Sequence, residues 1–121
     1  MGQTFELQPW VTIQAATGVS TKIQDVDEWV NTKRFQTCGI LLEVPKLSGC
    51  TLVVEGCDDR GGSFTTLKAL TASFTAGTVV LLRSTDPYGS ARRLTELIRW
   101  RLEPDVAGPW EATFRVNLVM T

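Results

Sequence analysis

Apolar and polar residues alternate along most of this chain with a period of two, which is typical of β-strands that bury one face. The clearest alternation spans residues 110–120. One face of that predicted strand holds Ala112, Phe114, Val116, Leu118 and Met120. Runs rich in apolar, β-branched and aromatic residues predict further strands at about residues 1–14, 21–24, 35–44, 51–57, 64–70, 73–82 and 96–103.

Residues 35–44 and 51–57 are expected to form the centre of the fold. Residues 45–49 contain proline and glycine, so we predict a turn there that joins the two strands as a hairpin. Pairing Val44 with Cys50 brings the apolar positions of both strands onto one face. A shift by one residue would set an isoleucine against a glutamate, so the first register is preferred.

Residues 94–103 fit two patterns. Their leucines and isoleucine fall on one stripe of a helix, whereas Ile98, Trp100 and Leu102 also alternate as in a strand. Because predicted strands flank this segment on both sides, we expect a strand from about Glu96.

Other positions predict interruptions. Pro9 breaks or bulges the first strand, because proline cannot donate to a ladder of hydrogen bonds. Asp25 caps a single helical turn, or else residues 25–30 form an edge segment. Residues 76–77 (Ala-Gly) predict a tight turn, and residues 86–89 (Asp-Pro-Tyr-Gly) predict another within a long polar loop.

Seven or eight short strands separated by regular turn signals indicate an all-β fold. We predict an antiparallel β-sandwich of jelly-roll type, with a small barrel as the alternative. A length of 121 residues fits one domain, residues 1–121, with a sizeable core.

The composition argues against several classes of function. The net charge is −1, which argues against a nucleic-acid or anionic-membrane surface as the main role. The chain begins without a basic segment and a long apolar run, so we expect no signal peptide and no membrane span. Histidine is absent, which removes Ser-His-Asp and Cys-His catalysis and histidine-bound zinc. We therefore expect no enzyme, no cofactor and no metal.

The chain has three cysteines, Cys38, Cys50 and Cys57. Because this number is odd and we expect no secretion signal, the sequence predicts free thiols. Cys50 and Cys57 stand seven positions apart on one predicted strand. They would point to opposite faces at a separation of roughly 20 Å, too far for a disulfide.

The sequence contains two acidic clusters. The first consists of Glu55, Asp58 and Asp59, and the second of Asp25, Asp27 and Glu28. The first has oxygen ligands that suit calcium, but the spacing is not that of an EF-hand, and a solvated turn is the preferred interpretation. The second offers a carboxylate pair for glycoside hydrolysis, but a solvated face or helix start is preferred.

The basic cluster consists of Arg92, Arg93, Arg99 and Arg101. On the predicted strand, Arg99 and Arg101 share one face with Glu103. An exposed sheet face of mixed charge is the simpler interpretation, and a partner interface is the alternative.

The four tryptophans divide by their sequence context. Trp100 alternates with apolar neighbours and is predicted to be in the core, whereas Trp10, Trp29 and Trp110 lie beside turns or prolines. Such aromatic side chains either anchor protein contacts, which we favour, or stack on sugar rings. The predicted interface residues are therefore Trp10, Trp29, Arg99, Arg101 and Trp110.

The order of several motifs resembles that of small phage and prophage virion proteins. The matching segments are residues 51–59 (TLVVEGCDD), 98–102 (IRWRL) and 112–116 (ATFRV). The chain departs from the pattern at Cys57, where serine is usual, and at Phe64, where tryptophan is usual. The resemblance extends over most of the chain and implies a capsid decoration or head–tail protein with a β-sandwich fold. It implies no catalytic residue.

These observations together predict a structural protein of a virion or phage-like particle that is assembled in the bacterial cytoplasm. It would contact copies of itself, as a homo-oligomer, and a capsid or other particle protein. The alternative is a carbohydrate-binding β-sandwich module that uses the tryptophans beside the turns.

Overall fold

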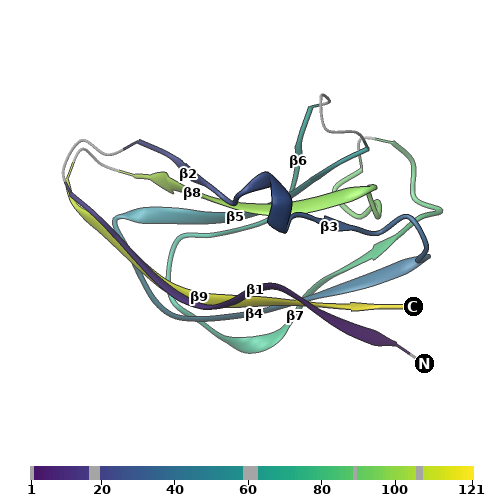
Figure 1. Ribbon diagram of the computed structural model, residues 1–121, viewed down its shortest axis with the longest axis horizontal. Helices are drawn as coiled ribbons and strands as arrows, with labels where there is room; N and C mark the ends of the chain where they lie inside the picture. Colours follow the sequence, from purple (N-terminus) through teal and green to yellow (C-terminus); the bar gives the residue numbers. More distant parts are fainter. Residues whose placement is uncertain (1, 17–19, 59–62, 89, 106–107) are drawn as a thin grey trace.

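The computed structural model describes residues 2–16, 20–58, 63–88, 90–105 and 108–121, and these form two antiparallel sheets that face each other (Figure 1). Sheet A contains, in spatial order, β1 (Gln3–Ala15), β9 (Trp110–Met120), β4 (Thr37–Ser48) and β7 (Phe74–Arg83). Sheet B contains β2 (Lys22–Ile23), β8 (Leu97–Pro104), β5 (Cys50–Cys57) and β6 (Thr65–Leu70), and β3 (Val30–Asn31) also pairs with β8. The predicted antiparallel β-sandwich is confirmed.

The inner faces of the two sheets form the core. The alternation predicted for β9 is confirmed, because its five apolar positions are all fully buried. Trp100 of β8 is also in the core, as predicted, and its ring meets that of Phe114 edge to face with centroids 5.0 Å apart. The strand expected near residues 96–103 is β8, so the helical alternative for this segment is wrong.

The predicted hairpin between β4 and β5 is wrong, because the two strands lie in different sheets. β4 continues through the expected turn to Ser48, and the chain then crosses to sheet B at Gly49. Gly49 has φ +73°, and a Cβ there would lie 2.9 Å from the carbonyl oxygen of Pro109. Only glycine suits this corner. Two strands can bury their apolar faces by packing against each other from opposite sheets just as well as by pairing side by side in one sheet.

The turn predicted at residues 76–77 is also wrong. β7 runs without a break from Phe74 to Arg83, and Gly77 pairs with Leu42 of β4. The register of this pairing shifts between Ile40 and Leu41 and again between Leu42 and Val44. The glycine therefore marks an irregular stretch of a strand and not its end.

Residues 22–31 combine both structures that were considered for this region. β2 and β3 each pair with β8, and a 3₁₀ turn (Val26–Glu28) lies between them. Asp25 precedes this turn but makes no capping hydrogen bond with its side chain. The segment is thus an edge of sheet B that a single helical turn interrupts (Figure 1).

β1 runs along β9 as the edge strand of sheet A, so the two ends of the chain lie side by side (Figure 1). Its register shifts between Glu6 and Val11, which confirms the irregularity predicted at Pro9. Within the described residues, no helix is long and apolar enough to cross a membrane.

Candidate functional site on the outer faces of the two sheets

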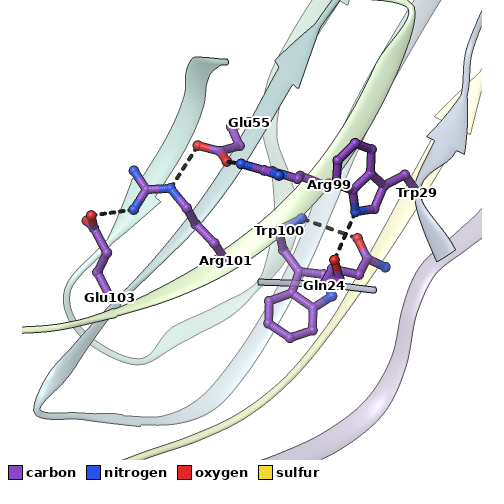
Figure 2. A network of polar contacts seen from close by, with 7 residues as sticks. All are labelled: Gln24, Trp29, Glu55, Arg99, Trp100, Arg101 and Glu103. Carbon is purple, nitrogen blue, oxygen red and sulfur yellow. Dashed lines mark hydrogen bonds and ion pairs between the residues drawn. The ribbon is translucent and has the colours of Figure 1, made fainter. Parts of the chain in front are cut away.

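Three of the predicted interface residues lie together on the outer face of sheet B (Figure 2). Glu55 of β5 stands directly opposite Arg99 of β8. Its carboxylate accepts a hydrogen bond from Nε of Arg99 at 2.8 Å and one from Nε of Arg101 at 2.8 Å, and Arg101 also pairs with Glu103. Glu55 is only 3% exposed although it lies on the outer face of its sheet.

The hydrogen bond to Glu55 raises the pKa of Arg101, with a further contribution from Glu103. Two arginines and two glutamates make the group neutral overall. Because the two guanidinium groups already donate to carboxylates of this chain, the face offers little attraction to an anionic partner. The mixed charge on this face agrees with the simpler interpretation, but Glu55, Arg99 and Arg101 are largely buried, so the expectation that the face is exposed is wrong for them.

Two aromatic rings cover this group of charges. Cζ of Arg99 lies 3.5 Å from the ring centroid of Phe64 and 4.9 Å from that of Trp29. The two rings meet edge to face at 5.5 Å. The contacts between guanidinium and rings are favourable and also keep water away from Glu55. We call Trp29, Glu55, Phe64, Arg99, Arg101 and Glu103 the sheet-B cover.

Gln24, which the sequence analysis did not single out, fixes the position of this cover. Its backbone carbonyl accepts a hydrogen bond from Nε1 of Trp29 at 2.9 Å, and its Oε1 accepts one from the backbone N–H of Trp100 at 3.3 Å (Figure 2). Its Nε2 donates to the carbonyl of Leu7 in sheet A at 2.6 Å. The buried Gln24 thus joins the two sheets through its side-chain amide and holds Trp29 through its backbone carbonyl.

The outer face of sheet A carries a similar pair in more open surroundings. Glu43 of β4 stands opposite Arg115 of β9, and Nε of Arg115 donates to its carboxylate at 2.6 Å. The ring of Trp10 lies 4.9 Å from Cζ of Arg115 and is part of a residue that is 51% exposed. Leu81, on the same face, is 41% exposed. We call Trp10, Glu43, Leu81 and Arg115 the sheet-A face.

Trp110 does not belong to either surface. It is only 3% exposed and packs within the core at the start of β9. Its ring is therefore not presented at a loop tip, contrary to the expectation for a tryptophan beside a turn. Trp10 is the most exposed of the four tryptophans, whereas Trp29 is half-buried and packs beside Arg99 and against Phe64.

The acidic clusters separate in space. Glu55 faces the two arginines, whereas Asp58 pairs with Arg93 at 3.6 Å, and Asp59 lies outside the described residues. The acids of the second cluster are exposed around the 3₁₀ turn. Within the described part of the chain, no three potential ligands come together to hold a metal ion.

All three cysteines are buried, but in different places. Cys38 belongs to sheet A, and Cys50 and Cys57 stand at the two ends of β5 in sheet B. Burial raises the pKa of the Cys38 thiol from its ordinary value of 9.0 to about 12. Burial, followed by the charge of Asp105, raises the pKa of Cys50. Neither thiol is poised to act as a nucleophile.

A pocket that sequence reasoning missed lies at one end of the sandwich, where three connecting segments meet. It has a volume of about 350 Å³ and is lined among others by Lys33, Asp58, Tyr88, Arg93 and Glu96. The sequence signal nearest to this pocket was the turn predicted at residues 86–89, which would place Tyr88 in a polar loop, although Gly89 of that turn lies outside the described residues.

Comparisons of the chain with protein-family models, with curated proteins and with solved structures found no match.

Proposed function

We propose that this protein is a non-enzymatic structural component of a phage-like particle, of the capsid-decoration or head–tail type, and that it acts through protein–protein contacts. The particle assignment is supported by the resemblance of the motif order to small virion proteins. Residues 51–57, 98–102 and 112–116 of the matching segments fall on β5, β8 and β9, which are central strands of the two sheets.

The observation that carries the contact role is the half-exposed Trp10 over Arg115 on the sheet-A face. Tryptophan and arginine are the residue types most enriched among those that dominate the binding energy of protein interfaces. Here they lie side by side and are supported by a sheet, so little conformational entropy is lost when a partner covers them.

The charges beside them favour a second copy of the chain as one partner. Glu43 and Arg115 form one pair of opposite charges, and Lys46 and Glu111 form another at 3.6 Å. A face that carries both signs next to each other can match itself about a two-fold axis, with the acid of one copy against the base of the other. The other partner is the shell protein of the particle.

Light scattering across a concentration series tests self-association. We expect a mass above that of the monomer that rises with concentration, and we expect Trp10→Ala to shift this association to higher concentration by at least tenfold. Tyr88→Ala is the matched control, because it removes another exposed aromatic ring from a different surface.

A strictly monomeric protein that also fails to bind purified phage-like shells would contradict the proposal. A monomer that binds shells through Trp10 would limit the proposal to a decoration role.

A further inference from the structure

The pocket at the end of the sandwich is assembled around one rigidly held arginine. Nη1 of Arg93 donates to the backbone carbonyls of Ser84 at 2.9 Å and Asp86 at 3.0 Å. Its Cζ lies 3.9 Å from the ring centroid of Tyr88. Two backbone acceptors and a stacked ring therefore fix the plane of the guanidinium before any ligand arrives.

The same arginine retains a hydrogen-bond donor whose demand is not met. Among the residues that the structure describes, the buried Nε of Arg93 has no hydrogen-bond partner, and Oδ2 of Asp58 lies 3.6 Å away. The side chain of Asp58 is 43% exposed and can rotate. A hydroxyl group that enters as Asp58 turns can accept from the Nε–H and donate to the carboxylate, because a hydroxyl does both.

The charges of the pocket select the kind of ligand. Arg93 faces Asp58, and Lys33 pairs with Glu96 at 3.3 Å, so the two cations and two anions around the pocket cancel. An anion would meet two carboxylates and a cation would meet two basic groups. The polar lining suits a neutral ligand that offers donors and acceptors together.

Tyr88 adds an apolar platform at the same place. The residue is 78% exposed, although Arg93 covers one face of its ring. An aromatic ring beside paired donors and acceptors matches a sugar, which has apolar C–H faces and a rim of hydroxyl groups. We propose that this pocket binds a neutral saccharide unit, with Tyr88 as the stacking surface and Arg93 and Asp58 as the hydroxyl-binding pair.

Titration of the isotope-labelled full chain with glucose, galactose and N-acetylglucosamine, followed by NMR, tests the proposal. We expect at least one of these sugars to shift the Nε–H signal of Arg93 saturably, with a dissociation constant on the order of 1 mM for so small a ligand. Inorganic phosphate and acetate are the anionic probes, and glycerol is a polyol without a ring.

Tyr88→Ala should weaken sugar binding by about fivefold or more, because it removes the stacking surface from an exposed position. Asp58→Ala should weaken it as well, whereas Trp10→Ala should leave it unchanged. The proposal is overturned if no sugar shifts the Arg93 signal, if phosphate or acetate shifts it more strongly than any sugar does, or if glycerol matches the sugars. It is also overturned if binding survives Tyr88→Ala unaltered. Because Trp10 and Tyr88 lie on separate surfaces, this outcome and that of the light-scattering experiment are independent.

Discussion

Glu55–Arg99 and Glu43–Arg115 are two copies of one interaction in different surroundings. Each joins a glutamate and an arginine that face each other directly on neighbouring antiparallel strands, on the outer face of a sheet. The side chain of Glu55 is 4% exposed and that of Arg99 14%, whereas the values for Glu43 and Arg115 are 29% and 34%. The difference comes from the aromatic residues around them.

In sheet B the rings of Trp29 and Phe64 lie against Arg99 and close the pair off from water. In sheet A the single ring of Trp10 lies beside Arg115 and leaves the face open. The sheet-B cover therefore behaves as a small second core that contains charges. The sheet-A face keeps its charges and its tryptophan accessible to a partner.

The largest difference between the two pairs should appear when each glutamate loses its charge. Glu55→Gln should lower the free energy of unfolding by about 3 kcal/mol, because it leaves the largely buried Arg99 without its counter-charge and leaves Arg101 with Glu103 alone. The matched change Glu43→Gln should lower it by at most about 1 kcal/mol, since exposed ion pairs contribute little. Urea unfolding followed by tryptophan fluorescence measures both. Equal losses in the two variants would mean that the cover does not exclude water from Glu55.

The tryptophans should differ in the same direction. Trp29→Ala removes a ring that packs on Arg99 and Phe64, so we expect a loss of about 2 kcal/mol in the free energy of unfolding. Trp10→Ala should change it by no more than about 0.5 kcal/mol at concentrations where the protein is monomeric. A large loss for Trp10→Ala would assign that ring to the fold itself and weaken its role as a contact residue.

Thiol reactivity tests whether the cover is closed. Cys57 lies two positions from Glu55 on the same outer face of β5, yet it is as buried as Cys38 in the core. We expect both thiols to resist iodoacetamide in the native protein. Trp29→Ala or Glu55→Gln should expose Cys57 to alkylation while Cys38 stays protected, and mass spectrometry of peptides distinguishes the two sites. Equal reactivity of the two thiols would indicate global unfolding and not an opened cover.

The raised pKa of Cys38 also predicts the direction of a pH effect. Between pH 9 and about 12 the unfolded thiol has lost its proton while the folded thiol keeps it. The folded state then binds more protons, so the free energy of unfolding falls as the pH rises through this window. Cys38→Ala should show a shallower fall between pH 9 and 11 in urea unfolding. An identical slope in both proteins would contradict the assigned pKa.

The sequence was sufficient for the strands and for the fold class, because burial of one face imposes a period of two on any strand. It was not sufficient to predict which strands pair with each other. Leu42 and Leu52 both face the core, and alternation cannot say whether they do so from one sheet or from opposite sheets. The positive φ of Gly49 turns the chain from sheet A into sheet B. From the sequence alone, this position is known only to be a glycine.

The candidate sites were predictable only in part for the same reason. Arg99 and Arg101 were placed correctly on one face, but their partner Glu55 is 44 and 46 positions away and is set by the pairing of β5 with β8. The pocket around Arg93 depends on three segments that meet at one end of the sandwich. A local pattern contains no information about such a meeting.

The smallest expected effect concerns salt. At about 1 M NaCl the screening length is roughly 3 Å, so charges in contact with water lose much of their attraction, whereas buried charges lose little. Double-mutant cycles with Glu43→Gln and Arg115→Gln should give a coupling energy that falls by about half on addition of salt. The cycle with Glu55→Gln and Arg99→Gln should give a coupling that changes by less than about 0.3 kcal/mol, which is close to the precision of such cycles. If both coupling energies fall by the same amount, solvent and its ions reach Glu55. The two faces would then differ only in side-chain packing and not in their access to water.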